Sequence, residues 1–247
     1  MMSDGPDADR VYVVTGAASG IGAATVERLS ASAITIAVDR DAIEPTNAIE
    51  MQFDVTEEAA WQDAVASVKE RFGRIDGLIN CAGVIRMAPI TDMPIEDFQL
   101  VMKVNVEGTF LGMKHVLPSM YAAGKGSIVN ISSTAGIAGA AQAGAYCASK
   151  GAVRMLTKSA ALEAIAYPSA VRVNSIHPAM TETPMVQKIV KQLGGATEIE
   201  DQMRQLQPSG AFIPVDAVVD GIEFLLSDSS THMNGSEFII DNGFTAA

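Results

Sequence analysis

Residues 11–22, with the sequence VYVVTGAASGIG, decide the fold of this chain. The β-branched run VYVVT predicts a strand, and a helical pattern follows it. Gly16, Gly20 and Gly22 lie between them, where glycine permits a tight turn and lets backbone N–H groups approach a phosphate at the helix N-terminus. Their spacing is GxxxGxG and differs from the GxGxxG of the dinucleotide fingerprint. Such a glycine turn is also typical of ordinary strand–helix connections, so both interpretations are open at this point.

Strand-like and helical segments alternate along the whole chain, which is typical of a parallel sheet covered by helices on both faces. The expected strands span 11–15, 34–38, 49–53, 77–81, 127–131, 171–176 and 236–241. The expected helices span 20–31, 57–72, 95–121, 145–166 and 214–227. We therefore predict a doubly wound α/β fold and interpret residues 1–247 as a single domain.

Two segments are expected to stand apart from this alternation. The acidic start, residues 1–9, lacks an apolar run and is interpreted as a flexible tail rather than a signal peptide. Residues 184–210 are too long for a simple connection, and they are helix-like but interrupted by Gly194 and Gly195. Long excursions of this kind usually form lids or binding loops, so we expect this segment to be a substrate lid.

The composition excludes several classes of partner. A net charge of -12 argues against nucleic-acid or anionic-membrane partners, and no run of eighteen apolar residues predicts a membrane span. Cys81 and Cys147 have neither CxxC spacing nor a His cluster beside them, so no metal site is expected. Two free thiols fit a reducing compartment, and a cytoplasmic location is predicted.

Asp39 strengthens the dinucleotide interpretation of the glycine turn. It ends the second predicted strand, twenty-three residues after Gly16, where a carboxylate can accept hydrogen bonds from an adenosine ribose. A carboxylate there would repel a 2′-phosphate, which favours NAD over NADP. The alternatives are that Asp39 is an ordinary turn residue and that Arg40 pairs with a 2′-phosphate. We interpret Arg40 as solvated.

Tyr146 and Lys150 stand four residues apart on a predicted helix, so the phenol and the ammonium share one face. A free phenol loses its proton near pH 10, and a neighbouring cation lowers that pKa. Ser133 lies thirteen residues before Tyr146 and offers a hydroxyl that can hold a substrate oxygen. Each residue also has a structural interpretation, as a strand end or a half-buried helix residue. Together with a dinucleotide site, they predict redox chemistry at an alcohol or carbonyl.

The chain resembles the short-chain dehydrogenase/reductase family from about residue 11 to its C-terminus. The resemblance is carried, in order, by TGAASGIG, Asp39, DV at 54–55, NCAG at 80–83, the Asn in KVNVEG, SIVNISS, YCASK and HPAMTETP. It implies a seven-stranded Rossmann fold, a nicotinamide cofactor and hydride transfer. It also implies a homotetramer, in which the helix at 145–166 pairs across a two-fold axis and the C-terminal strand makes a second interface.

The same resemblance implies a role for individual residues. Tyr146 would be the general acid/base, Lys150 would lower its pKa and bind the nicotinamide ribose, and Ser133 would polarise the substrate oxygen. Asn105 would bend its helix and link Lys150 to solvent through a water. The residues expected to contact the cofactor are Gly16, Ser19, Gly20, Ile21, Gly22, Asp39, Asp54, Val55, Asn80, Ala82, Gly83, Tyr146, Lys150, Thr181 and Thr183.

The sequence departs from the family pattern at two positions. Cys81 replaces an asparagine, which we interpret as a packing change. Ala179 replaces the glycine that usually follows the proline of HPAMTETP, and its methyl group can shift the turn that carries Thr181 and Thr183. The cofactor contacts assigned to those two threonines depend on that turn.

The substrate is predicted to be an uncharged, mainly apolar and cyclic secondary alcohol or its ketone. The residues expected to line its site are Ile85, Gln142, Met180, Met185 and Met203. No Lys or Arg is placed in the sequence to hold an anionic substrate. The segments HPAMTETPM and IIDNGFTAA are similar to those of bacterial dehydrogenases of hydroxysteroids and alicyclic alcohols. The alternatives are a reductase of another carbonyl class and an NAD-binding sensor without turnover.

Overall fold

The computed structural model describes residues 9–44, 46–195 and 197–246. Most of the tail expected at 1–9 therefore falls outside the described residues. The strands are β1 Val11–Thr15, β2 Ile34–Asp39, β3 Ile49–Gln52, β4 Gly77–Asn80, β5 Lys125–Ile131, β6 Ala170–Pro178 and β7 Glu237–Ile240. The α-helices are α1 Gly20–Ser30, α2 Glu58–Phe72, α3 Ile95–Met102, α4 Gly108–Ala123, α5 Gly144–Ile165, α6 Pro184–Gln192, α7 Thr197–Gln205 and α8 Val215–Leu226.

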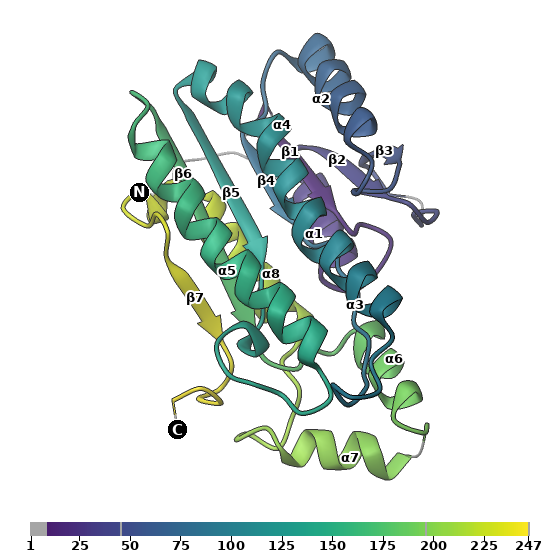
Figure 1. Ribbon diagram of the computed structural model, residues 1–247. Coiled ribbons are helices and arrows are strands. Elements are labelled where there is room, and N and C mark those ends of the chain that lie inside the picture. The colour runs from purple at the N-terminus through teal and green to yellow at the C-terminus, as the bar shows by residue number, and fades with distance from the viewer. Residues whose placement is uncertain (1–8, 45, 196, 247) are drawn as a thin grey trace.

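The strands form one seven-stranded parallel sheet in the order β3-β2-β1-β4-β5-β6-β7. Helices cover both of its faces, and α6 and α7 lie beyond the carboxyl ends of the strands, at the lower end of the view in Figure 1. The predicted doubly wound fold is therefore confirmed. The chain reverses its direction of progress across the sheet between β1 and β4, and such a switch point opens a crevice at the carboxyl ends of the strands.

Two apolar cores lie on opposite faces of the sheet because successive strand residues point to opposite sides. Val11 and Val13 of β1 pack on the face covered by α2, α4 and α5. Tyr12 and Val14 pack on the other face, against α1 and α8. Burial on both faces is the reason that the strands are rich in β-branched residues. Within the described residues, none of the helices combines enough length with enough apolar character to span a membrane.

The helix predicted over 95–121 is interrupted. A π-helical segment, Lys103–Glu107, joins α3 to α4 and contains the buried Asn105. Such π-helical segments are frequent at functional sites. The excursion predicted at 184–210 forms α6 and α7, and Gly194 and Gly195 break the helical path between them with φ angles of +118° and +76°.

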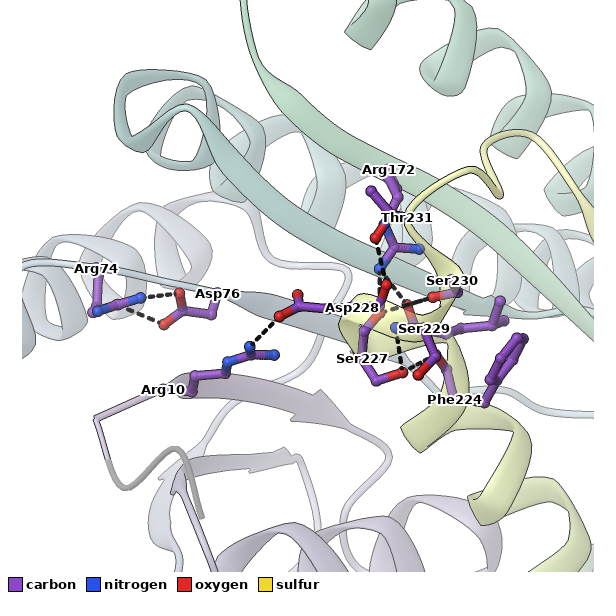
Figure 2. A network of polar contacts seen from close by, with 11 residues as sticks. Arg10, Arg74, Asp76, Arg172, Phe224, Ser227, Asp228, Ser229, Ser230 and Thr231 are labelled. Atoms are coloured by element: carbon purple, nitrogen blue, oxygen red, sulfur yellow. Dashed lines mark hydrogen bonds and ion pairs between the residues drawn. The ribbon is translucent and has the colours of Figure 1, made fainter. Parts of the chain in front are cut away.

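The amino ends of the strands are joined by a polar network (Figure 2). Asp76, just before β4, accepts hydrogen bonds from the backbone N–H of Val11 and from a neighbouring arginine at 2.9 and 2.8 Å. Arg10 pairs with Asp228 at 3.3 Å, and Arg172 of β6 donates to carbonyl groups at the end of α8. These contacts connect neighbouring strands with the turn after α8, so the amino ends of the strands are engaged in structural interactions. The carboxyl ends carry the residues singled out in the sequence.

Candidate active site

The turn between β1 and α1 is built so closely that its glycines cannot carry a side chain. Gly16 has a φ of +70°, and a Cβ there would lie 2.8 Å from the Ala82 backbone nitrogen. A Cβ on Gly22 would lie 2.1 Å from the Gly16 carbonyl oxygen. Both distances are far below van der Waals contact, so only glycine fits. No side chain covers the backbone at these glycines. We call this turn, residues 16–22, the glycine cradle; it leads into the first residues of α1.

The N-terminus of α1 carries unsatisfied backbone donors. Ser19 is the N-cap residue, yet its side chain makes no capping hydrogen bond, and the first turn contains no acidic residue. The first N–H groups of a helix lack partners inside the helix and attract anions. Thr183 is next to this turn, since a Cβ on Gly20 would lie 3.3 Å from its methyl group. The cradle therefore fits the pyrophosphate of a dinucleotide.

Asp39 ends β2 beside the same turn. Its carboxylate accepts hydrogen bonds from the backbone N–H groups of Ala18 and Asp41 at 2.9 and 3.0 Å. Arg40 is exposed and makes a loose ion pair with Asp41, at 3.9 Å. Both Asp39 and Arg40 line the cavity described below. A fixed carboxylate with further acceptor capacity is thus present where an adenosine ribose would lie.

A large open cavity, about 340 Å³ in volume, runs along the carboxyl ends of the strands. Fourteen of the fifteen predicted cofactor residues line it, namely Gly16, Ser19, Gly20, Ile21, Gly22, Asp39, Asp54, Val55, Ala82, Gly83, Tyr146, Lys150, Thr181 and Thr183. The exception is Asn80. Its side chain is buried and donates a hydrogen bond to Asn130 on β5 at 2.8 Å, so it connects two strands instead of facing the cavity.

Asp54 lies at the adenosine side of this cavity. Its partial burial raises the carboxyl pKa, but hydrogen bonds from Thr56 and the positive charges of Arg40 and Lys103 outweigh that effect and lower the pKa overall. The group is therefore ionised at neutral pH and can accept hydrogen bonds.

Ser133, Tyr146 and Lys150 meet at the other end of the cavity. Tyr146 and Lys150 extend from the first two turns of α5, and the Lys150 ammonium lies 5.5 Å from the centre of the Tyr146 ring. Lys150 is buried, and its ammonium donates a 2.7 Å hydrogen bond to the carbonyl of Ile131 at the end of β5. Ser133 follows that strand, and the side chain of His177 lies 3.1 Å from its carbonyl oxygen. A phenol and an ammonium from α5 thus converge with a hydroxyl from the segment after β5.

Burial dominates the acid–base properties of this group. It raises the pKa of Tyr146 to about 12, although the Ser133 hydroxyl beside it acts in the opposite direction. Burial also lowers the pKa of Lys150 to about 8. Without a cofactor, desolvation therefore has the largest effect on the phenol pKa, and the expectation that Lys150 and an oxidised nicotinamide together lower it stays a prediction. At neutral pH the phenol is protonated and the ammonium is mostly charged.

Asn105 does not line the cavity, but its hydrogen bonds hold two segments of the cavity wall together. Its side chain accepts a hydrogen bond from the Val84 N–H at 2.8 Å and donates to the Val84 carbonyl at 3.0 Å. It also donates to Ser149 of α5 at 2.9 Å. A Cβ on Gly83 would lie 3.4 Å from the Asn105 amide oxygen and 3.6 Å from the Lys150 ammonium. Asn105 therefore fixes the loop after β4 against the helix that carries Tyr146 and Lys150.

Three of the five predicted substrate residues, Ile85, Met180 and Met185, line the cavity, and the Met185 sulfur lies 4.0 Å from the Tyr146 hydroxyl. The other two do not. Gln142 is exposed on a turn, has a φ of +62°, and is not among the residues that line the cavity. Met203 is buried inside the cluster that joins α6 to α7, with Val186, Val190 and Phe212.

Sequence reasoning also missed residues that line the cavity. Lys188 is exposed on α6 at the cavity edge, although no Lys or Arg was expected near the substrate. Gln207, just after α7, and Phe244, near the C-terminus, also line it. The amphipathic pattern of α6 could have placed Lys188 on its polar face, but no sequence signal marks Gln207 or Phe244.

Comparisons with known proteins agree with this geometry. The model of the short chain dehydrogenase family matches residues 10–194. Cyclopentanol dehydrogenase of Comamonas sp. is 34% identical over 96% of this chain and 98% of its own length. The 3-alpha-(or 20-beta)-hydroxysteroid dehydrogenase of Mycobacterium bovis is 35% identical over 96% of this chain and 90% of its length. The crystal structure of levodione reductase superimposes with a TM-score of 0.90 at 33% identity, and the match covers 97% of this chain and 98% of that one. The chain therefore belongs to the short chain dehydrogenase family and is a nicotinamide-dependent oxidoreductase.

Proposed function

We propose that the protein interconverts a cyclic secondary alcohol and the corresponding ketone, with NAD as the cofactor. The observation that carries the proposal is the convergence of Ser133, Tyr146 and Lys150 in a cavity that the glycine cradle and Asp39 also line. The relatives named above act on cyclopentanol, a hydroxysteroid and levodione, according to their names. Turnover of cyclic alcohols and ketones, followed by the absorbance of reduced nicotinamide, tests it.

The cofactor fits the described residues. The glycine cradle and the free N–H groups at the start of α1 would hold the pyrophosphate, and Asp39 would bind the adenosine ribose. Tyr146 and Lys150 would contact the nicotinamide ribose. When bound, the nicotinamide accepts or returns the hydride of the alcohol carbon, and in its oxidised form it adds a positive charge to the site.

Tyr146 exchanges the proton of the substrate oxygen. In ketone reduction the phenol donates its proton to the oxygen that becomes the hydroxyl, and in alcohol oxidation it accepts that proton. A phenol whose pKa burial raises to about 12 is fully protonated at neutral pH, as a proton donor must be. Lys150 stabilises the phenolate that remains after donation, because its charge lies close by and is itself buried.

Ser133 and Asn105 serve this exchange in different ways. The Ser133 hydroxyl donates a hydrogen bond to the substrate oxygen, where negative charge develops during reduction. Asn105 acts at a distance, because it holds Val84 and Ser149 and so fixes the wall against which Lys150 packs. It is a positioning residue.

The position of Asp39 supports NAD over NADP. Replacing Asp39 with Ser is expected to reduce the preference for NAD by roughly 10-fold or more, since removing one nearby like charge changes an interaction by at least about one factor of ten. Arg40 stays in place and is free to meet a 2′-phosphate. Steady-state kinetics with both cofactors measure the change, and Asp41→Ser, two residues further on, is the matched control. Equal use of NAD and NADP by the unmodified protein would contradict the assignment of Asp39.

The lid predicted at 184–210 is proposed to close over the substrate. The first of its helices, α6, contributes Met185, Val186 and Ile189 to the cavity wall, and Met203 anchors the second helix to it. Closure of such an apolar face excludes water from the reacting atoms. Hydrogen exchange in this segment is expected to slow when NAD and a cyclic ketone bind together. Unchanged protection in the ternary complex, with slowed exchange in the cradle as the positive control, would rule out a lid that closes.

Oligomerisation is proposed from the exposed apolar side chains of α5. Met155, Leu162 and Ile165 are 61%, 70% and 68% exposed. They lie on the helix that borders a groove with α4, and Ile239 of the edge strand β7 is 44% exposed. Such apolar surface marks protein–protein contacts, and we propose a homotetramer that uses both surfaces. Light scattering is expected to give about four times the 25.9 kDa chain mass. Leu162→Glu should lower it, and a monomeric unmodified protein at micromolar concentration would refute the proposal.

A further inference from the structure

Gln207 carries a buried amide oxygen that has no partner. The residue follows α7, its side chain is only 4% exposed, and its backbone is engaged with Arg204 and Gly210. The Oε1 atom is fully buried and accepts no hydrogen bond from any residue in the three described ranges of the chain. Burying an amide oxygen without a partner lowers stability, because it loses its hydrogen bonds to water. Native proteins therefore retain few such groups, and those that remain call for an explanation.

The location of this amide supplies the explanation. Gln207 lines the same cavity as Ser133 and Tyr146. Of the other buried side-chain atoms without a hydrogen bond in the described ranges, Arg154 Nε and Ser169 Oγ, neither belongs to a residue that lines this cavity. Apart from the charged Lys188, the lining residues from the lid, and Met180 and Phe244 from elsewhere, are mostly apolar, with Met185, Val186 and Ile189 on α6. An unsatisfied polar group within an apolar wall is the arrangement that orients a ligand.

The chain on both sides of Gln207 is also held in place by its surroundings. Met203, four residues earlier on α7, and Phe212, five residues later, are both buried in the apolar cluster with α6. Ile213 pairs with Thr181 in a short parallel bridge, and its N–H donates to the Met180 carbonyl at 2.8 Å. The chain on both sides of Gln207 is thus fixed to the cavity wall. No hydrogen bond from the described residues holds the Gln207 oxygen, so the amide can rotate on this fixed backbone to meet a donor in the cavity that the residue lines. An unsatisfied acceptor of this kind discriminates strongly against ligands that cannot fill it.

We infer that Gln207 binds a second hydroxyl group of the substrate, remote from the carbon that is oxidised, so that the preferred substrates are cyclic diols and hydroxyketones. The inference rests on the proposed function, and it narrows the substrate class. A hydroxyl is the complementary group because it donates to an amide oxygen and accepts from an amide nitrogen, whichever way the amide is turned. A methyl group can do neither, and a ketone or ether can only accept. Gln207 takes no part in proton transfer, and its only role is to select the substrate.

The inference is tested by comparing substrates that differ in one group. The values of kcat/KM with NAD are measured for cyclohexanol, for the methylcyclohexanols as size controls, and for the three positional isomers of cyclohexanediol. At least one diol isomer is expected to be preferred over its methyl counterpart by roughly 10- to 100-fold, because the counterpart leaves the buried amide unpaired. The substitution Gln207→Met, which keeps the length of the side chain, should bring that ratio down to about one.

Two further measurements control for folding and for the cofactor. Gln205→Met changes an exposed glutamine two residues away and should retain the diol preference. Gln207→Met should unfold at the same temperature as the unmodified protein or a higher one, since it replaces an unpaired buried amide with an apolar group of similar shape. A lower unfolding temperature would mean that the amide has a structural partner, and the inference would fall.

The remaining outcomes separate this inference from the function on which it rests. Turnover of cyclohexanol without a preference for any diol, or with a preference that survives in Gln207→Met, overturns the role of Gln207 and leaves the proposed function standing. A rise in the KM for NAD in Gln207→Met that matches the loss in diol use would assign the amide to the cofactor and also overturn it. No turnover of any cyclic alcohol, diol or ketone contradicts both.

Discussion

Replacing Tyr146 with phenylalanine is expected to lower turnover of a cyclic alcohol or ketone by roughly 10²- to 10⁴-fold, the usual contribution of a positioned acid or base. The change removes the only atom of the side chain that can carry the proton, and it leaves the ring in place. Cofactor affinity should change little, because the cradle and Asp39 are untouched. Kinetics in both directions and a titration with NAD measure the two effects.

The control for this variant is Tyr167→Phe, which removes the hydroxyl of a half-exposed tyrosine stacked on Tyr121, far from the reacting group in the groove between α4 and α5. It should keep the turnover of the unmodified protein. Oxidation by the unmodified protein is expected to become faster as the pH rises, because the phenol accepts the proton only after it has lost its own. Tyr146→Phe should lose this pH dependence. Turnover within about twofold of the parent would remove Tyr146 from the mechanism.

Replacing Lys150 with methionine is expected to separate activity from stability. Turnover should fall by roughly 10- to 10³-fold, since a nearby opposite charge changes the pKa of its partner by about 1–3 units. Affinity for the cofactor should also fall, because the contact with the nicotinamide ribose is lost. Thermal unfolding at pH 7 should nevertheless occur at a higher temperature than in the unmodified protein, because burial opposes the Lys150 charge and methionine buries without that cost.

The pH dependence of this stability difference has a definite sign. The pKa of Lys150 falls from 10.5 in the unfolded chain to about 8 in the folded one, which corresponds to about 3 kcal/mol of destabilisation at about 1.36 kcal/mol per unit. The destabilisation is fully present below pH 8, where both states are charged, and it disappears as the pH rises towards 10.5. Loss of the hydrogen bond from Lys150 to Ile131 offsets about 1 kcal/mol of the stability that the methionine variant gains. An advantage of the methionine variant that grows with pH would contradict the burial of a charged Lys150.

The sequence predicts the sheet and the cofactor end of the site well because local patterns determine both. Seven strand-like runs, all but two of them separated by helical segments, leave little choice of fold, and the strands form in the predicted places with ends shifted by at most two residues. The glycines of the first turn are recognisable because the close approach of Ala82 and the Gly16 carbonyl excludes any side chain. Asp39 is recognisable because strand ends at the switch point face the crevice.

The substrate end is less predictable because it is made by packing between distant segments. Met203 and Met185 look equivalent in the sequence, yet only Met185 faces the cavity, and Met203 is enclosed between α6 and α7. Gln142 sits on a left-handed turn that no glycine or asparagine marks. Gln207 is one of several glutamines in a polar stretch, and its burial depends on Phe212 and the bridge of Ile213 to Thr181. The pKa of Tyr146 likewise depends on burial, which the spacing from Lys150 does not reveal.

The most direct test of the central claim is single-turnover oxidation of a cyclic secondary alcohol by the purified protein with NAD, compared between the unmodified chain and Tyr146→Phe. Reduced nicotinamide should accumulate in one equivalent per active site with the unmodified protein, and in the variant it should form at least about 10²-fold more slowly although NAD remains bound. If the unmodified protein binds NAD and produces no reduced nicotinamide from any cyclic alcohol, or if both proteins produce it at the same rate, the assigned function or its mechanism is contradicted.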